Sequence, residues 1–108
     1  MKSEEFTAFV EGLNVTRMRL LEDRGDEYAK DVDKLSALKE AATVWSTLHP
    51  LSPLKPSQIA EVLAIIKQVR YANLQSQGVE PIRLLDTLLD YHNYLDLKAA
   101  CETEEARK

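Results

Sequence analysis

The 108-residue chain contains very few of the residues that build disulfides, metal sites and tight turns. Cys101 is its single cysteine, so it has neither a partner for an internal disulfide nor a set of thiolate ligands. Its two histidines, His49 and His92, are far apart in the sequence and do not supply a zinc site. Three glycines are too few for a glycine-rich phosphate loop. These shortages exclude several enzyme classes and favour a reducing compartment.

Basic clusters and long apolar runs are missing as well. The net charge is −4, and no group of lysines and arginines is interleaved with aromatic residues, which argues against direct binding of nucleic acid. No apolar stretch approaches the roughly 18 residues of a membrane span. Glu4 and Glu5 stand where a signal peptide would carry basic and then apolar residues. We therefore expect a cytoplasmic protein that binds neither nucleic acid nor membranes.

The residues that are abundant predict helices. Apolar residues make up 44% of the chain and recur at helical spacing in four segments. Ser3 is expected to cap the first helix and Gly25 to end it. Residues 101–108 have no apolar anchor and are expected to fray. We therefore predict an all-α, four-helix bundle-like domain over residues 1–100, with a proline-rich crossover between the second and the third helix. The second helix is expected to begin near Asp31 or Asp33, the third at Pro56 or Ser57, and the fourth at Pro81.

The last two predicted helices carry both apolar and charged rows. In the third helix, the predicted core stripe includes Ile59, Val62, Leu63, Ile66 and Val69. In the fourth, apolar residues nearly encircle the helix, and the main face is expected to consist of Leu84, Leu85, Leu88, Tyr91, His92 and Leu95. A row of acidic and amide side chains projects from the other side of this helix and is expected to face a cleft or a second subunit. The second of these alternatives corresponds to a homo-oligomer, which is our prediction for the chain.

Asp86 and Asp90 are the best candidates for metal ligands. They lie one helical turn apart, so their carboxylates project from the same side of the helix. Mg²⁺ takes one or two protein carboxylates and completes its octahedron with water and phosphate oxygens. Lys67 and Arg70, also one turn apart, can bind the phosphates. The alternatives are an internal salt bridge between the two rows, or acids that are simply solvated.

The segment 85–95 resembles the second acidic helix of the MazG-like all-α nucleotide pyrophosphohydrolases. In that family a Glu-x-x-Asp motif followed by apolar residues helps to bind magnesium. Asp90 matches the aspartate of the motif, whereas Thr87 stands at the position of the glutamate and Asp86 is the candidate substitute. The wider pattern, over residues 20–99, is similar to small phage proteins grouped with these enzymes, and its motifs are Arg24-x-x-x-Tyr28, Ala41-x-x-x-Trp45, Lys67-x-x-Arg70 and Asp86-x-x-x-Asp90.

The resemblance implies an activity and a set of site residues. The activity is magnesium-dependent cleavage of a nucleoside triphosphate into a monophosphate and pyrophosphate. The family's first motif, Glu-Glu-x-x-Glu, has no counterpart here, which favours the alternative of a non-catalytic module that binds a nucleotide or inhibits a host protein. The implied metal ligands are Asp86 and Asp90 with Glu40 or Glu61, the phosphate-binding residues are Lys67 and Arg70, and the candidate contacts to base or sugar are Trp45, Asn73 and Asn93.

Overall fold

The computed structural model contains four α-helices and no β-strand within residues 1–28, 33 and 35–107, which are the residues that the structure describes, excluding the side chains of 24–28. None of the described helices is long and apolar enough to cross a membrane. The all-α, four-helix prediction is confirmed. In chain order the helices are α1 (Ser3–Tyr28), α2 (Ser36–Leu48), α3 (Pro56–Ser76) and α4 (Pro81–Ala106).

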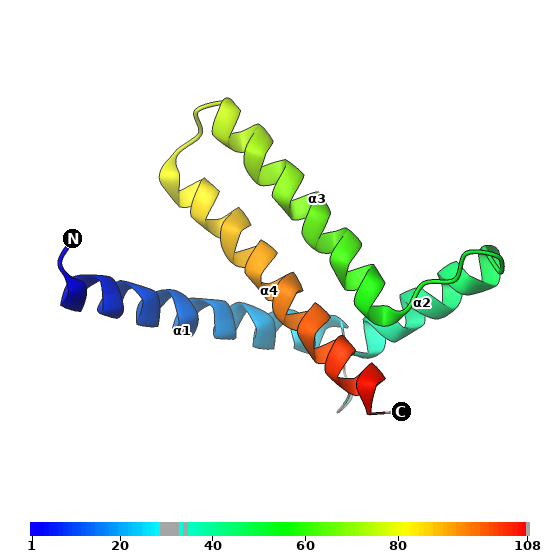
Figure 1. The fold of residues 1–108 in the computed structure, drawn as a ribbon. Helices are drawn as coiled ribbons and strands as arrows, with labels where there is room; N and C mark the ends of the chain where they lie inside the picture. The colour runs from blue at the N-terminus through cyan, green and yellow to red at the C-terminus, as the bar shows by residue number, and fades with distance from the viewer. Residues whose placement is uncertain (29–32, 34, 108) are drawn as a thin grey trace.

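Helices α3 and α4 form an antiparallel hairpin at the centre of the molecule (Figure 1). Each begins with a proline, Pro56 or Pro81, at a position where the missing N–H costs no helical hydrogen bond. The turn between them contains Gly78, whose φ of 66° favours a residue without a side chain. The contact is lined by small buried residues, including Ala60 and Ala64, which let the two backbones approach closely.

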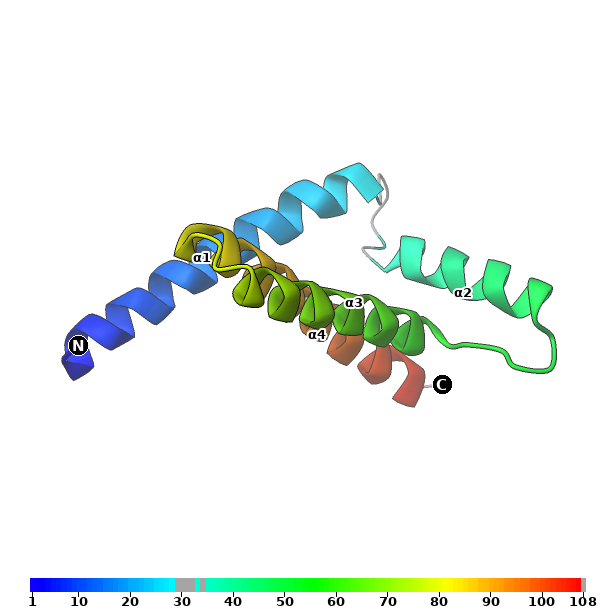
Figure 2. The same cartoon turned by 90° about the horizontal axis from the view of Figure 1, so that it is seen from above.

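Helices α1 and α2 extend from the hairpin in opposite directions, so the molecule is elongated (Figures 1 and 2). Its principal extents are 50 × 32 × 25 Å. Helix α1 crosses α4, where Arg17 Nη1 donates a hydrogen bond of 2.7 Å to Asp96 Oδ2. The N-terminal half of α1 projects beyond this crossing (Figure 1). Phe6 and Phe9 lie on that half and are exposed.

The core lies where the start of α2, the start of α3 and the end of α4 meet. Leu35, Leu38, Ala60 and Cys101 are buried together there, and Ile59, Leu63 and Leu97 pack against them. We expected fraying after residue 100, but α4 continues to Ala106. The reason is that this last part of α4 is anchored: Cys101 is buried, and Glu105 Oε1 accepts a hydrogen bond of 3.1 Å from the Ser57 N–H.

Helix α1 also runs further than predicted. It passes through Gly12 and Gly25 and ends at Tyr28, so Gly25 does not end it. A glycine inside a helix costs about 1 kcal/mol relative to alanine, which the rest of a 26-residue helix can outweigh. The side chains of Arg24 and Tyr28, which belong to the wider motif pattern, lie outside the described residues.

The contact faces of α3 and α4 differ from the prediction. On α3, the large residues Val62, Ile66 and Val69 are exposed, and the small residues face α4. On α4, the buried positions are Thr87, Leu89, Asn93 and Cys101, whereas the predicted main face is half-buried or exposed. The cause is the size of the contact residues, because two helices that meet through alanine and threonine pack more closely than two that meet through leucine and isoleucine.

Candidate ligand cavity

All four helices contribute to a cavity of about 660 Å³ beside the core. This volume lies within the range of small-molecule sites in proteins. Its wall is mainly apolar, with a few polar side chains from α1 and α4. The lining side chains are Met18, Leu21 and Glu22 of α1, Leu35, Ala37, Leu38 and Ala41 at the start of α2, Ile59 and Leu63 of α3, and Asp90, Asn93, Tyr94, Asp96, Leu97 and Ala100 of α4.

Asn93 is the most unusual residue of this cavity. It exposes 5% of its surface, and neither its amide nitrogen nor its amide oxygen has a hydrogen-bond partner among the residues that the structure describes. Burying an unsatisfied polar group costs about 1–3 kcal/mol. A carboxamide in this position is therefore unfavourable until something with both a donor and an acceptor reaches it.

Asp90 lies one turn before Asn93 and also lines the cavity. Its Oδ2 accepts a hydrogen bond of 3.4 Å from Lys67 Nζ, and both side chains are largely buried between α3 and α4. The structure thus brings Lys67, Asp90 and Asn93 to one side of the hairpin. The acidic row could form an internal salt bridge with the basic row or be solvated, and the contact between Lys67 and Asp90 is an internal salt bridge.

Asp86 and Arg70 continue the two charged rows toward the α3–α4 turn, and both are exposed. Arg70 lies on the same face of α3 as Ile59 and Ile66, which the sequence predicts to be buried, and a buried arginine would need an acidic partner. Its exposure in the structure removes that requirement. The reason is the rotation of α3, which points the Ile66 side of the helix to solvent. Arg70 therefore remains available at the surface, one turn beyond Lys67.

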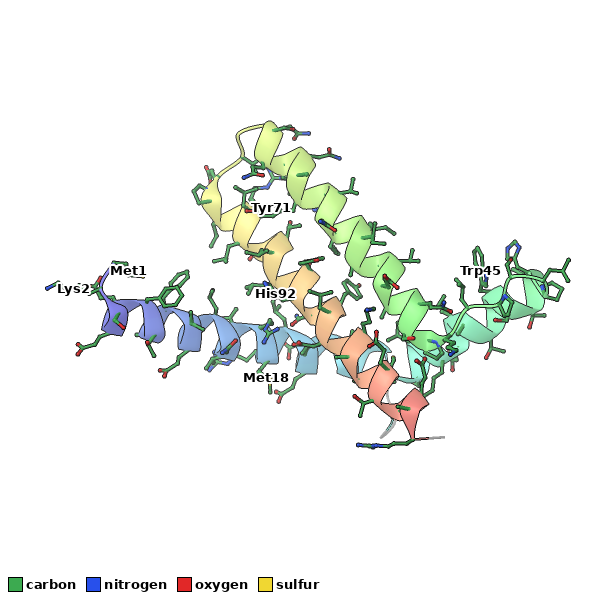
Figure 3. All side chains as sticks on the ribbon, in the orientation of Figure 1. Met1, Lys2, Met18, Trp45, Tyr71 and His92 are labelled. Atoms are coloured by element: carbon green, nitrogen blue, oxygen red, sulfur yellow. The ribbon has the colours of Figure 1, made fainter. Side chains whose placement is uncertain are left out.

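The remaining predicted site residues lie away from the cavity lining. Glu40 and Glu61 are exposed on α2 and α3, and Asn73 is exposed near the end of α3. Trp45 lies at the far end of α2 from the hairpin (Figure 3). Its Nε1 donates a hydrogen bond of 2.8 Å to the carbonyl oxygen of Ser52, and its ring lies 4.2 Å from that of His49. The tryptophan therefore holds the proline-rich crossover against α2.

The donor set expected for Mg²⁺ is dispersed. Asp86, Asp90, Glu40 and Glu61 come from three helices, and of these Asp90 alone lines the cavity. In the described part of the chain, no three His, Cys, Asp or Glu side chains gather closely enough to hold a metal ion. The residues present do not fit a site of several carboxylates, and magnesium binding by this set stays a prediction.

Glu22 and Asp96 line the cavity but were not identified from the sequence. A basic side chain on the apolar stripe of a helix usually extends its charged end into water, but the guanidinium of Arg17 pairs with Asp96. The sequence contained one indication of this contact, because Arg17 falls on the apolar stripe of its helix and a partly buried arginine favours a carboxylate partner. The identity of the partner could not be predicted, since the two residues are 79 positions apart.

Comparisons of the chain with protein-family models, with curated proteins and with solved structures found no match. The similarity to MazG-like enzymes therefore rests on the short motifs described above. The cavity and its side chains are the basis for a functional proposal.

Proposed function

We propose that this protein is a nucleotide-binding helical module whose ligand enters the cavity beside the core. The observation that carries the proposal is the buried, unpaired amide of Asn93 in the lining of an apolar cavity of about 660 Å³. Such a cavity has room for a planar base and its sugar. The amide atoms are covered in the ligand-free structure, so we expect the lining side chains to shift when the base enters, after which the base pairs with the amide and covers the apolar wall.

The chemistry of the side chains supports a nucleotide over other small molecules. A carboxamide carries one acceptor and two donor hydrogens, which complement the donor–acceptor edge of a base, as in asparagine–adenine pairs. Lys67, which pairs with the cavity-lining Asp90, and the exposed Arg70 one turn further along α3 do not line the cavity themselves. We expect them to supply positive charge for phosphates that extend beyond it. The resemblance to MazG-like proteins points to the same class of ligand. We place this binding in the cytoplasm, in agreement with the single cysteine.

The proposal contains no hydrolytic step, because the described carboxylates do not gather around a shared metal position. Asp90 is engaged by Lys67, and Asp86 is exposed. Binding without cleavage is the alternative that the missing Glu-Glu-x-x-Glu motif already favoured. Magnesium-dependent pyrophosphohydrolysis remains the competing prediction.

The binding test uses calorimetric titration of the full chain with ribo- and deoxyribonucleoside triphosphates, with and without Mg²⁺. We expect at least one nucleotide to bind, and Asn93→Leu to weaken that binding tenfold or more. The ligand-free variant should melt at the same temperature as the wild type or higher, because the substitution removes a buried unsatisfied group. Asn73→Leu is the matched control on an exposed asparagine and should bind like the wild type.

Unchanged affinity in Asn93→Leu, or the absence of binding to any nucleotide, would contradict the proposal. The same incubations, analysed by chromatography, separate binding from turnover. We expect the nucleotides to be recovered intact. Monophosphate and pyrophosphate that appear with Mg²⁺ and disappear in Asp90→Asn would replace the binding proposal with the hydrolase.

A further inference from the structure

The outer face of α3 carries an exposed apolar stripe. Val62, Ile65, Ile66 and Val69 expose 47%, 50%, 56% and 55% of their surfaces. Their spacing of three, four and seven residues places them on one side of the helix. We call Val62, Ile65, Ile66 and Val69 the outer stripe; contiguous exposed branched side chains of this kind mark interaction surfaces. By contrast, Tyr71 is on another face of α3 and lies between α3 and α4 (Figure 3).

The molecule exposes more surface than a monomer of its size. Its accessible area is 7988 Å², about 1,900 Å² more than the value expected for a folded monomer of 12.3 kDa. Its radius of gyration is 16.1 Å, whereas a compact chain of this length has about 13 Å. A stable protein interface covers about 800 Å² on each partner. The excess area is therefore sufficient for a dimer interface.

We infer that the outer stripe is the centre of a two-fold symmetric dimer interface, with a second copy of this chain as the occupant. The stripe reads Val-x-x-Ile-Ile-x-x-Val, which is the same in both directions. A two-fold axis between Ile65 and Ile66 pairs the antiparallel α3 helices so that Val62 of each copy faces Val69 of the other. Symmetric interfaces require this self-complementarity, in which one patch packs against itself.

The interface and the cavity are separate. Ile59 and Leu63 line the cavity, whereas the outer stripe points away from α4. Figure 1 shows α4 between α3 and α1, so the outer side of α3 is open to a partner. Dimer formation needs no nucleotide, and failure of the dimer leaves the binding proposal untouched.

The first test measures the mass of the full chain by sedimentation equilibrium over a range of concentrations. We expect twice the 12.3 kDa of one chain. Ile66→Glu should raise the dimer dissociation constant at least tenfold, because it would bury two carboxylates beside the axis, close to each other and opposite Ile65 of the other copy. Ile82→Glu is the matched control, since Ile82 is 61% exposed and lies outside the stripe, and it should remain dimeric. A monomeric wild type, or equal effects of the two substitutions, would overturn the inference.

A second test examines the antiparallel register and uses milder substitutions. In this pairing, position 62 of one copy lies opposite position 69 of the other. Two cysteines at position 62, one in each copy, would therefore be offset by seven residues, or about 10 Å along the helices, which is too far for a disulfide. A mixture of Val62→Cys and Val69→Cys chains should therefore form a disulfide-linked heterodimer on mild oxidation, and each variant alone should not. Cys101 is buried and does not interfere. Equal cross-linking of each variant alone would exclude this register.

Discussion

At the scale of single residues, Lys39 joins the start of α2 to the end of α4. Its ammonium lies 2.6 Å from a carboxylate oxygen of Asp33 and 3.2 Å from one of Glu104. Hydrogen bonds to these two residues raise the pKa of Lys39 above 10.5. The hydrogen bond from Lys39, with one from the Leu35 N–H, lowers the pKa of Asp33 below 3.8. Both shifts mean that the folded state favours the charged forms.

Replacement of Lys39 by methionine should lower the melting temperature at neutral pH, by a small amount because these groups are near the surface. The contribution of Asp33 is complete above its ordinary pKa of 3.8 and is lost as the pH falls through the lowered value. The contribution of Lys39 is complete below 10.5 and is lost as the pH rises through the raised value. The melting temperatures of the wild type and of Lys39→Met should therefore differ at pH values between the lowered pKa of Asp33 and the raised pKa of Lys39, and should converge at more acidic and more basic pH. A difference that does not change with pH would contradict this account.

At the scale of helices, Ala60 decides how closely α3 and α4 can pack. It has no exposed surface and lies in both the helix contact and the core. We expect Ala60→Leu to lower the free energy of unfolding by about 1–3 kcal/mol, because a larger side chain forces the helices apart. Ala72→Leu, at an exposed position of the same helix, should change it by less than about 0.5 kcal/mol. Urea unfolding measures the free energy of unfolding of both variants. Equal effects would show that the size of the side chain at position 60 does not limit how closely α3 and α4 pack.

The sequence predicted where the helices lie better than which faces they bury. Pro56 and Pro81 mark the starts of α3 and α4, and apolar periodicity marks their lengths. The buried face of α3 could not be identified, because large apolar residues occupy the side that is exposed in the structure. A pattern based on hydrophobicity favours Ile66 over Ala60, whereas packing at short distance favours the alanine.

Only part of the candidate site could be predicted, because periodicity indicates the position of a helix better than its neighbours. Lys67 and Asp90 could be placed on facing helices, because a short connection makes α3 and α4 antiparallel neighbours. The cavity itself depends on how α1 and α2 approach this hairpin. Contacts such as Arg17 with Asp96 connect residues too distant in sequence for periodicity to indicate.

At the scale of the whole molecule, the excess surface has a thermodynamic consequence. If unfolding separates two chains, mass action raises the melting temperature with protein concentration. We expect an increase of about 3 °C for each tenfold increase in concentration. Melting of Ile66→Glu should be independent of concentration over the range where it is monomeric. Scanning calorimetry at several concentrations tests this, and a constant melting temperature for the wild type would argue against the dimer.

The crossing of α1 and α4 joins residues that are synthesised at very different times during translation. Arg17 leaves the ribosome first, and Asp96, its partner, follows 79 residues later. At roughly 5–20 residues per second, this interval lasts about 4–16 s. During that time Met18 and Leu21, which later line the cavity, have no α4 to pack against. We therefore expect the nascent N-terminal helix to expose these apolar side chains for several seconds, while the α3–α4 hairpin can form as soon as its own residues emerge.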